Sequence, residues 1–351
     1  MGWRIGVIGG DGIGPEVVEQ GLRVLRHLDA RERLGLEEVP FDLGAERYLR
    51  TGDTLPDADF ERLRDEVDAI YLGALGDPRV PSNVHAKDIL LGLRFRLDLY
   101  VNFRPITLLD ARRCPLKDKG PADVDMVVFR ENTEGLYTGV GGQFKRGTPD
   151  EVAIEAELNT RKGVERIIRA AFDHAEERGA PSVCMADKAN AMRHGHDLWQ
   201  RVFREVAAEH PSIRAFHLYV DVLAMEMVRA PERFDVVVTN NLFGDIVTDL
   251  GAQLQGGIGL AASANLHPGQ GPGLYEPVHG SAPDLVGKGT ANPLAALLTA
   301  GWMLEHHGRA DLNQEIHDAV RGCLLADEVT PELGGTLGTT EVTDRVIARL
   351  G

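Results

Sequence analysis

Two aspartates, Asp245 and Asp249, stand four residues apart in the segment NNLFGDIVTDL, residues 240–250. On a helix, side chains at this spacing lie on one face, so their negative charges repel unless a cation lies between them. Carboxylate oxygens are the ligands that Mg²⁺ and Mn²⁺ prefer. Asp221, directly after the strand-like run Phe216–Val220, is a candidate third ligand. The pattern indicates a divalent-metal site, with two solvated aspartates on a helix surface as the alternative.

Three arginines are candidates for binding a dicarboxylate. Arg94 lies in a helical segment, Arg104 lies in the strand-like YVNFRP, and Arg130 directly follows an apolar run. A guanidinium binds a carboxylate through a planar fork of donors. Leu90 and Leu91 precede Arg94 by one helical turn, so they share its face and offer an apolar wall. For each arginine alone a surface salt bridge is the simpler interpretation, but together they indicate a pocket for a di-anion.

Tyr137 and Lys188 are the candidates for proton transfer, although each alone would be interpreted as a structural residue. Lys188 ends the run VCMADK after a predicted strand, where active sites of α/β proteins gather. A lysine beside other cations and a metal can have its pKa lowered towards neutrality. His194 and His196 resemble a metal-ligand pair, but the sequence signals no carboxylate near them. Both are therefore interpreted as residues at the start of a helix.

Two glycine-rich segments are candidates for binding a nucleotide. The first, GGDGIGPEV (residues 9–17), lacks glycines at the i, i+2 and i+5 positions of the dinucleotide fingerprint, which excludes the usual Rossmann site. Its glycines still allow the backbone to approach a ligand closely. The second, residues 275–293, has small residues from His279 to Pro283 that could pack on an adenosine. Asp284 could bind a ribose diol and repel a 2′-phosphate, which favours NAD over NADP. An ordinary glycine- and proline-rich loop is the alternative.

The elements that must position these residues alternate between strands and helices. Strand-like runs span Arg4–Ile8, Ala69–Leu72, Met126–Phe129, Pro181–Met185, Ile213–Val220 and Phe234–Thr239, and helical stretches span Pro15–Leu28, Lys162–Glu177 and Asp197–Ala208. This alternation predicts an α/β protein with largely parallel strands. Residues 136–158 combine glycine-rich turns with alternating apolar residues, which predicts an extended hairpin arm that packs on a partner chain. A surface loop is the alternative there.

Length and composition exclude several classes of protein. A chain of 351 residues is expected to form about two domains. A formal charge of −16 without a basic block argues against binding nucleic acid. Cys114, Cys184 and Cys323 form no CxxC or Cys/His cluster, so they are expected to be buried and unpaired rather than zinc ligands. No apolar run is long enough to cross a membrane, and the N-terminus shows no signal-peptide pattern, so we expect a cytoplasmic protein.

Six motifs in this order resemble the β-decarboxylating dehydrogenases, the family of 3-isopropylmalate, isocitrate, homoisocitrate and tartrate dehydrogenases: GDGIGPEV, LxxR followed by NxRP, RENTEGLY, DKAN, NLFGDIVTD and EPVHGSAPD. The chain is most similar to the 3-isopropylmalate dehydrogenases that carry LGAxGDPxVPS and LLxLRF. The resemblance implies an α/β, isopropylmalate dehydrogenase-like two-domain fold with a mixed sheet flanked by helices and a non-Rossmann NAD site. Residues 1–98 and 251–351 would form the NAD-binding domain. Residues 99–250 would carry the dimer interface and the arm, at about 136–158.

The resemblance also implies roles for single residues. The substrate would contact Leu90, Leu91, Arg94, Arg104, Arg130 and Asp221. Tyr137 and Lys188 would be the catalytic acid/base pair. Asp221, Asp245 and Asp249 would bind Mg²⁺ or Mn²⁺, with Lys188 and Asp221 entering from the neighbouring subunit of a homodimer with shared active sites. NAD would contact Ile13, Glu276, His279, Gly280, Ser281, Ala282, Pro283, Asp284 and Asn292.

The implied reaction is the oxidative decarboxylation of a 3-substituted malate, a small 2-hydroxy diacid, with NAD. The first expectation is 3-isopropylmalate, converted to 2-oxoisocaproate in leucine biosynthesis. RENTEG, residues 130–135, is closer to isocitrate and homoisocitrate enzymes, and Lys87 could reach a third carboxylate. Ala191 leaves extra room in the pocket wall. An isocitrate, homoisocitrate or tartrate/malate-type enzyme is therefore the alternative. A non-catalytic regulatory subunit is a more distant alternative, because such a subunit is expected to have lost site residues and here all of them are present. No nucleic acid or membrane is expected as a partner.

Overall fold

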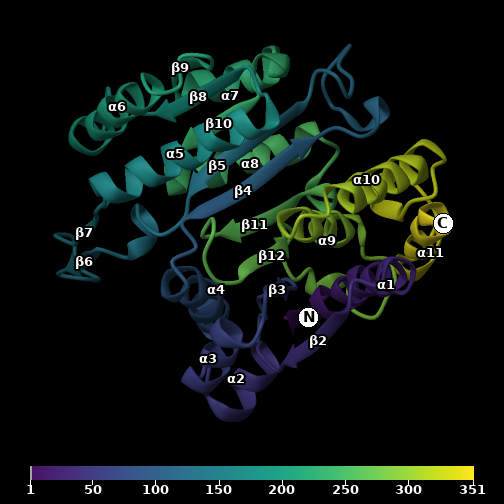
Figure 1. Cartoon of the computed structure of the whole chain (residues 1–351). Coiled ribbons are helices and arrows are strands. Elements are labelled where there is room, and N and C mark those ends of the chain that lie inside the picture. The colour runs from purple at the N-terminus through teal and green to yellow at the C-terminus, as the bar shows by residue number, and fades with distance from the viewer. Residues whose placement is uncertain (1) are drawn as a thin grey trace. The chain divides into compact units, whose positions relative to one another are not determined.

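The computed structural model describes residues 2–351, and the contacts within it divide the chain into two compact units (Figure 1). The first unit comprises Met1–Leu99, Thr107–Ala122 and Ala252–Gly351, and the second comprises Tyr100–Ile106 and Asp123–Gly251. The predicted α/β class, with a mixed sheet flanked by helices, is confirmed. The domain limits expected from the sequence remain a prediction. They place residues 107–122 in the second domain, whereas these residues group with the first unit here.

The strands of the first unit follow the order β2-β1-β3-β12-β11. All neighbours pair in parallel except β11 and β12, which are antiparallel. The strands are β1 (Trp3–Ile8), β2 (Leu36–Phe41), β3 (Ala69–Leu72), β11 (Ala262–Leu266) and β12 (Gly273–Pro277). The helices are α1 (Gly14–Glu32), α2 (Ala45–Thr51), α3 (Asp57–Asp65), α4 (Val84–Arg96), α9 (Leu294–His306), α10 (Ala310–Leu325) and α11 (Thr339–Leu350). Helix α9 is apolar on nearly all sides, and it is correspondingly buried against β11, β12, α1 and α10.

The strands of the second unit follow the order β4-β5-β10-β8-β9, and β5, β10, β8 and β9 run parallel. The strands are β4 (Val101–Thr107), β5 (Asp125–Glu131), β8 (Ser182–Asp187), β9 (Arg214–Tyr219) and β10 (Val236–Thr239). The helices are α5 (Arg161–Arg178), α6 (Arg193–Ala207), α7 (Val220–Arg229) and α8 (Asn241–Leu254). Helix α5 packs on β5, β8 and β10, while α7 packs on β8 and β9. The strand and helix runs predicted from the sequence are all confirmed, with ends displaced by at most a few residues.

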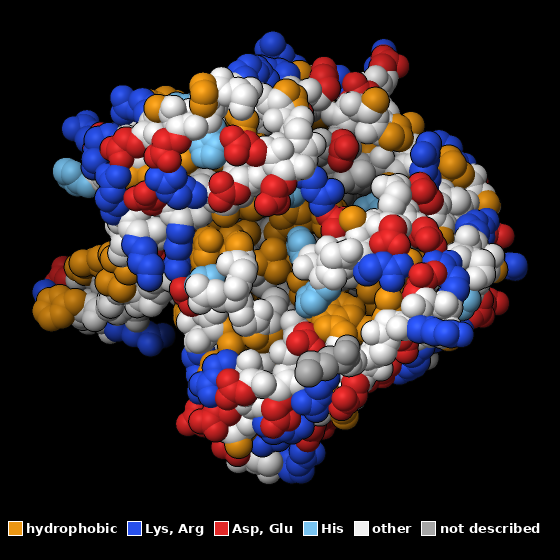
Figure 2. Space-filling model, in the orientation of Figure 1, with side chains coloured by type: hydrophobic (Ala, Val, Ile, Leu, Met, Phe, Trp, Pro, Cys, Tyr) orange, Lys and Arg blue, Asp and Glu red, His pale blue; other side chains and the backbone are white. Residues whose placement is uncertain are grey.

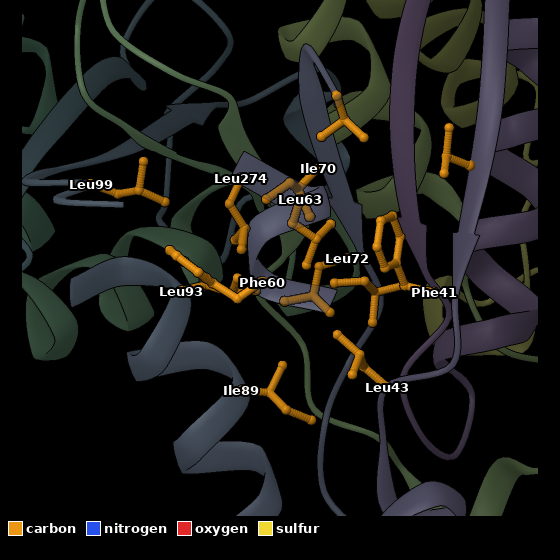
Figure 3. Close-up of a cluster of buried hydrophobic side chains, with 13 residues drawn as sticks. Phe41, Leu43, Phe60, Leu63, Ile70, Leu72, Ile89, Leu93, Leu99 and Leu274 are labelled. Atoms are coloured by element: carbon orange, nitrogen blue, oxygen red, sulfur yellow. The ribbon is translucent and has the colours of Figure 1, made fainter. Parts of the chain in front are cut away.

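A cluster of buried apolar side chains positions α4 within the first unit (Figure 3). Ile89 and Leu93 of α4 point into this cluster beside Phe60 of α3 and Leu72 of β3. Their spacing of four residues places them on one face of the helix. Because this face is buried, the rotation of α4 about its axis is fixed. The directions of Leu90 and Arg94, which directly follow Ile89 and Leu93 in the sequence, are fixed with it.

The first glycine-rich segment is held against other backbone, rather than left open. A Cβ on Gly10 would lie 2.2 Å from the carbonyl oxygen of Ala74, and one on Gly12 would lie 2.0 Å from that of Ser281. Both glycines have positive φ, 76° and 59°, which side chains disfavour. The sequence predicted a close approach to a ligand at these glycines. The structure shows that the close approach is to the loops after β3 and β12.

The predicted hairpin arm is present as β6 (Gly141–Phe144) paired antiparallel with β7 (Val152–Glu155). Exposed apolar side chains lie on the arm among polar and charged ones (Figure 2), with Phe144 65% and Ile154 61% exposed. Among residues 2–351, no helix is both long and apolar enough to cross a bilayer. All three cysteines are unpaired, and Cys184 and Cys323 are buried as expected, but Cys114 is partly exposed, so the expectation was wrong there.

Candidate active site

The candidate residues of the second unit follow the carboxyl ends of its parallel strands. Arg130 in β5 is level with Thr239, the last residue of β10. Strands β8 and β9 end level with each other. Lys188 directly follows β8, and Asp221 lies two residues after β9, in the first turn of α7. Helix α8, which carries Asp245, begins just after β10. Carboxyl ends of parallel strands are where α/β proteins bind ligands.

Arg130, Tyr137 and Asp245 form one hydrogen-bonded group. Arg130 is 1% exposed. It donates from Nη1 to Asp245 Oδ1 at 2.6 Å and from Nε to the carbonyl oxygen of Asn241 at 2.8 Å. The Tyr137 hydroxyl donates to Asp245 Oδ2 at 2.9 Å. Burial and the negative charge of Asp245 raise the pKa of Tyr137, so its hydroxyl keeps its proton at neutral pH and can donate it.

Asp249 lies one turn after Asp245 on α8, as predicted. Partial burial of its carboxyl group, together with the negative charge of Asp245, raises the pKa of Asp249. The positive charges of Arg104 and Arg130 act in the opposite direction. A divalent cation would relieve this repulsion between carboxylates, and ligands that are all oxygen suit Mg²⁺ or Mn²⁺. The residues present therefore fit a divalent ion.

Lys188 and Asp221 form a second group. Lys188 Nζ donates to Asp221 Oδ1 at 2.5 Å, and this bond lowers the pKa of Asp221. Within residues 2–351 of a single chain, no three Asp, Glu, His or Cys side chains gather in a way that could hold a metal. The predicted set of Asp221, Asp245 and Asp249 is thus not assembled by one copy of the chain.

The first unit positions Arg94, Leu90 and Leu91 on α4. Arg94 is buried and donates from Nη2 to Glu276 Oε1 at 2.9 Å. Asn265 donates to the same carboxylate oxygen at 3.0 Å. Leu90 packs partly against the apolar cluster, and Leu91 is half-buried. Sequence reasoning assigned Glu276 to the cofactor, but it did not detect the pairing with Arg94, 182 residues away.

The loop after β12 was predicted to bind adenosine, and it joins the loop after β1. The backbone N–H of Ile13 donates to the Ser281 carbonyl at 2.9 Å. His279 Nδ1 donates to the carbonyl of Gly280 at 3.0 Å, so Nε2 carries the lone pair. Burial lowers the pKa of His279 and keeps it neutral. Several buried polar atoms of the described residues have no partner, and two of them, His279 Nε2 and Asn292 Nδ2, belong to residues predicted to bind the cofactor.

These two atoms are one acceptor and one donor, and their burial without a partner is costly unless a ligand binds them. An adenine ring offers donors and acceptors to match. Ala282 adopts the left-handed conformation, with φ of 38°, and begins the single helical turn Pro283–Leu285. Asp284 in that turn is exposed and free to meet a ribose. The loop therefore fits a nucleotide cofactor.

The sequence did not reveal the partners of two buried histidines. His196 lies in the first turn of α6, as predicted, and its Nε2 lies 3.1 Å from Glu157, a carboxylate that the sequence did not signal. His85 donates from Nε2 to Asp11 at 2.8 Å. No local pattern signals either pair, because their members are 39 and 74 residues apart.

Comparison with known proteins agrees with this geometry. Residues 4–346 match the model of the isocitrate/isopropylmalate dehydrogenase family. A 3-isopropylmalate dehydrogenase of Thermobifida fusca is 49% identical over 99% of this chain and 97% of its own length. One from Streptomyces griseus is 48% identical over 95% of this chain and 96% of its own. The solved structure of isocitrate dehydrogenase from Methylococcus capsulatus matches 99% of each chain with a TM-score of 0.89 and 36% identity. The chain belongs to the isocitrate/isopropylmalate dehydrogenase family.

Proposed function

We propose that this chain catalyses the oxidative decarboxylation of 3-isopropylmalate to 2-oxoisocaproate and CO₂ with NAD, a step of leucine biosynthesis. The contact of Arg130 and Tyr137 with Asp245 carries the proposal. It places a guanidinium that binds anions and a phenol that holds its proton beside a carboxylate that suits a divalent ion. The relatives named above, at 48–49% identity, support the choice of substrate.

The substrate's two carboxylates would be bound by Arg94, Arg104 and Arg130. Arginine suits this role because its fork of donors matches a carboxylate. Leu90 and Leu91 would contact the isopropyl group, which gains about 0.8 kcal/mol for each buried methylene-sized unit. A third carboxylate in the same place would lose hydration without a partner. The apolar wall therefore favours 3-isopropylmalate over isocitrate.

Lys188 and Tyr137 would move the protons. The Lys188 amine removes the proton of the 2-hydroxyl group as the C2 hydride leaves. After CO₂ departs, the hydroxyl of Tyr137 donates its proton to the carbon that lost the carboxylate. The raised pKa of Tyr137 keeps that proton available until this step.

Two bound groups would complete the chemistry. Asp245, Asp249 and a second subunit's Asp221 would hold Mg²⁺ or Mn²⁺, which polarises the 2-hydroxyl and the developing carbonyl. Ile13, Glu276, Asn292 and the loop residues 279–284 would hold NAD, which accepts the hydride. The exposed carboxylate of Asp284 would repel the 2′-phosphate of NADP.

A homodimer would complete the shared site. The second unit exposes large apolar side chains on its arm and on α7 and α8, among them Phe144, Ile154, Met225 and Ile246. Patches of this kind are typical of protein interfaces. Phe144→Asp is expected to raise the dissociation constant of the dimer in sedimentation experiments. Leu325→Asp, at another exposed apolar position, on α10 of the first unit, is the matched control.

A second candidate is an isocitrate- or homoisocitrate-type enzyme, because Lys87 is exposed on α4 one turn before Leu91 and could meet a third carboxylate. The test is a panel of 3-isopropylmalate, isocitrate, homoisocitrate, tartrate and malate with NAD and Mg²⁺, following reduced cofactor and CO₂. The highest kcat/KM is expected for 3-isopropylmalate. A higher value for isocitrate or homoisocitrate, abolished by Lys87→Met, would establish the second candidate instead.

A further inference from the structure

A cluster of polar side chains lies beside Lys188 and has no part in the reaction as described. It consists of Glu157, His196 and Asn240, all within the second unit. The side chain of His196 has no exposed surface, and that of Glu157 is 8% exposed. Polar groups buried to this extent are costly unless their hydrogen bonds are satisfied, so their arrangement is constrained.

The hydrogen bonds of His196 define which ring nitrogen carries the proton. The backbone N–H of Lys188 lies 2.7 Å from His196 Nδ1. An amide N–H can only donate, so Nδ1 must accept and the ring proton lies on Nε2. Nε2 faces Glu157 Oε2 at 3.1 Å and donates to it. The ring therefore joins the Lys188 backbone to the carboxylate of Glu157.

Glu157 is held on its other side by the segment that begins α8. Asn240 donates from Nδ2 to Glu157, and its Oδ1 accepts from the backbone N–H of Phe243 at 2.9 Å. Burial would raise the pKa of Glu157, but hydrogen bonds from His196, Asn159 and Asn240 outweigh it and the pKa is lowered. Glu157 is thus a carboxylate, fixed at the base of the arm two residues after β7.

The same contacts define the direction of the Lys188 side chain. The Lys188 carbonyl accepts from the backbone N–H groups of Ala191 and Met192, at 2.9 and 2.8 Å. With its N–H bound to His196, both backbone groups of Lys188 are held. The remaining freedom lies in the side chain, which reaches Asp221. A shift of this backbone would move Nζ by a similar amount.

We propose that His196 and Glu157 are positioning residues for Lys188. His196 holds the Lys188 backbone through Nδ1, and Glu157 holds the His196 ring from the base of the arm. This inference rests on the proposed function in taking Lys188 as the proton-transfer group. The arm and the proton-transfer lysine are then parts of one hydrogen-bonded unit, so displacement of the arm reduces turnover without loss of substrate binding.

Two substitutions of His196 distinguish the contributions of its two ring nitrogens to turnover. His196→Asn keeps an acceptor in the place of Nδ1, whereas His196→Gln keeps only a donor in the place of Nε2. His196→Gln is expected to lower kcat about tenfold, the worth of one hydrogen bond, with little change in KM for the diacid. His196→Asn is expected to retain most of the kcat. His194→Gln, an exposed histidine in the same helical turn, is the matched control.

Glu157→Ala leaves the Nδ1 acceptor in place but frees the His196 ring, so it is expected to lower kcat by less than His196→Gln does. Glu177→Ala, which removes an exposed carboxylate on α5 outside the arm, is expected to leave kcat unchanged. A purely structural role would lower stability in both His196 variants and would not distinguish Asn from Gln. Equal values of kcat for His196→Asn and His196→Gln would overturn the proposal.

Measurements that need no substrate test the positioning role of His196 independently of the proposed function. Amide hydrogen exchange at Lys188 is expected to quicken about tenfold in His196→Gln and to stay slow in His196→Asn. Nitrogen-15 spectra of the histidine rings are expected to show His196 protonated on Nε2. Unchanged exchange in His196→Gln, or a proton on Nδ1, refutes the positioning role. Absence of turnover with every diacid by the unaltered enzyme refutes only the proposed function.

Discussion

Gly244 provides the sharpest test of the role of Arg130, because its lack of a side chain makes room for the arginine stem. In Gly244→Ala the new Cβ would lie 2.4 Å from Cγ and 2.7 Å from Cβ of Arg130. Alanine is preferred to glycine inside a helix by about 1 kcal/mol. Overpacking a rigid site costs about 1–3 kcal/mol. The variant is therefore expected to lose roughly 0–2 kcal/mol in its free energy of unfolding and to remain folded.

The expected loss of activity is larger than the loss of stability. Arg130 must shift, and its Nε and Nη2 are already bound to Asn241, so the Nη1 end that faces Asp245 moves. Loss of one charged hydrogen bond to the substrate costs about 1.5–3 kcal/mol, or roughly 10- to 150-fold in kcat/KM. Steady-state kinetics with 3-isopropylmalate and urea unfolding measure the two effects. The control is Gly322→Ala on α10, where the new methyl group meets only the exposed, flexible Arg349. A kcat/KM for Gly244→Ala within twofold of the unaltered enzyme would refute the assignment of Arg130.

Three further predictions concern the metal, the cofactor and pH. Asp245→Asn should abolish turnover at ordinary Mg²⁺ concentrations while circular dichroism shows an intact fold, and undiminished activity of the unaltered enzyme in a chelator would contradict the metal site. The enzyme should prefer NAD, and Asp284→Ser should raise kcat/KM for NADP relative to NAD by about tenfold, since a like charge is removed. A higher kcat/KM for NADP before any substitution would show that Asp284 does not select the cofactor. Burial among Phe103 and Phe129 lowers the pKa of His174 to about 4. Below about pH 6.5 the imidazole of His174 therefore binds a proton in the unfolded chain but not in the folded chain. The free energy of unfolding falls as pH falls, by about 2 kcal/mol between pH 7 and 5. Urea unfolding of His174→Gln should show a weaker pH dependence, and an identical one would exclude this group.

Local patterns in the sequence were sufficient to predict the strands and helices and the residues that lie just beyond the ends of strands. Strand β3 was predicted to the residue, because four apolar residues between polar turns have few other interpretations. The placement of Lys188 beyond β8 and the shared face of Asp245 and Asp249 follow from the same local rules. These features depend only on periodicity and on where a strand ends.

Contacts between distant segments could not be predicted in this way. The bond of Arg94 to Glu276 needs the rotation of α4, which is set by the burial of Ile89 and Leu93 in the apolar cluster. The contact of Arg130 with Asp245 needs Gly244 to leave room for the arginine. In each case the deciding quantity is a packing distance between elements, which has no signature in the spacing of residues along the chain.

The GDGIG segment has a structural role that its spacing along the chain did not reveal. Its buried Asp11 accepts hydrogen bonds from the backbone N–H groups of Ala45 and Gly76, at 2.7 and 2.8 Å, and from His85 at 2.8 Å. These partners belong to the segments that follow β2 and β3 and to α4, so one carboxylate joins three neighbouring segments of the first unit. A buried carboxylate with fewer partners would be strongly destabilising, and a longer side chain at Gly10 or Gly12 would push the loops apart. The motif's residue types are therefore dictated first by contacts within the protein, and the loop that results holds Ile13 against Ser281 of the loop that we propose binds NAD.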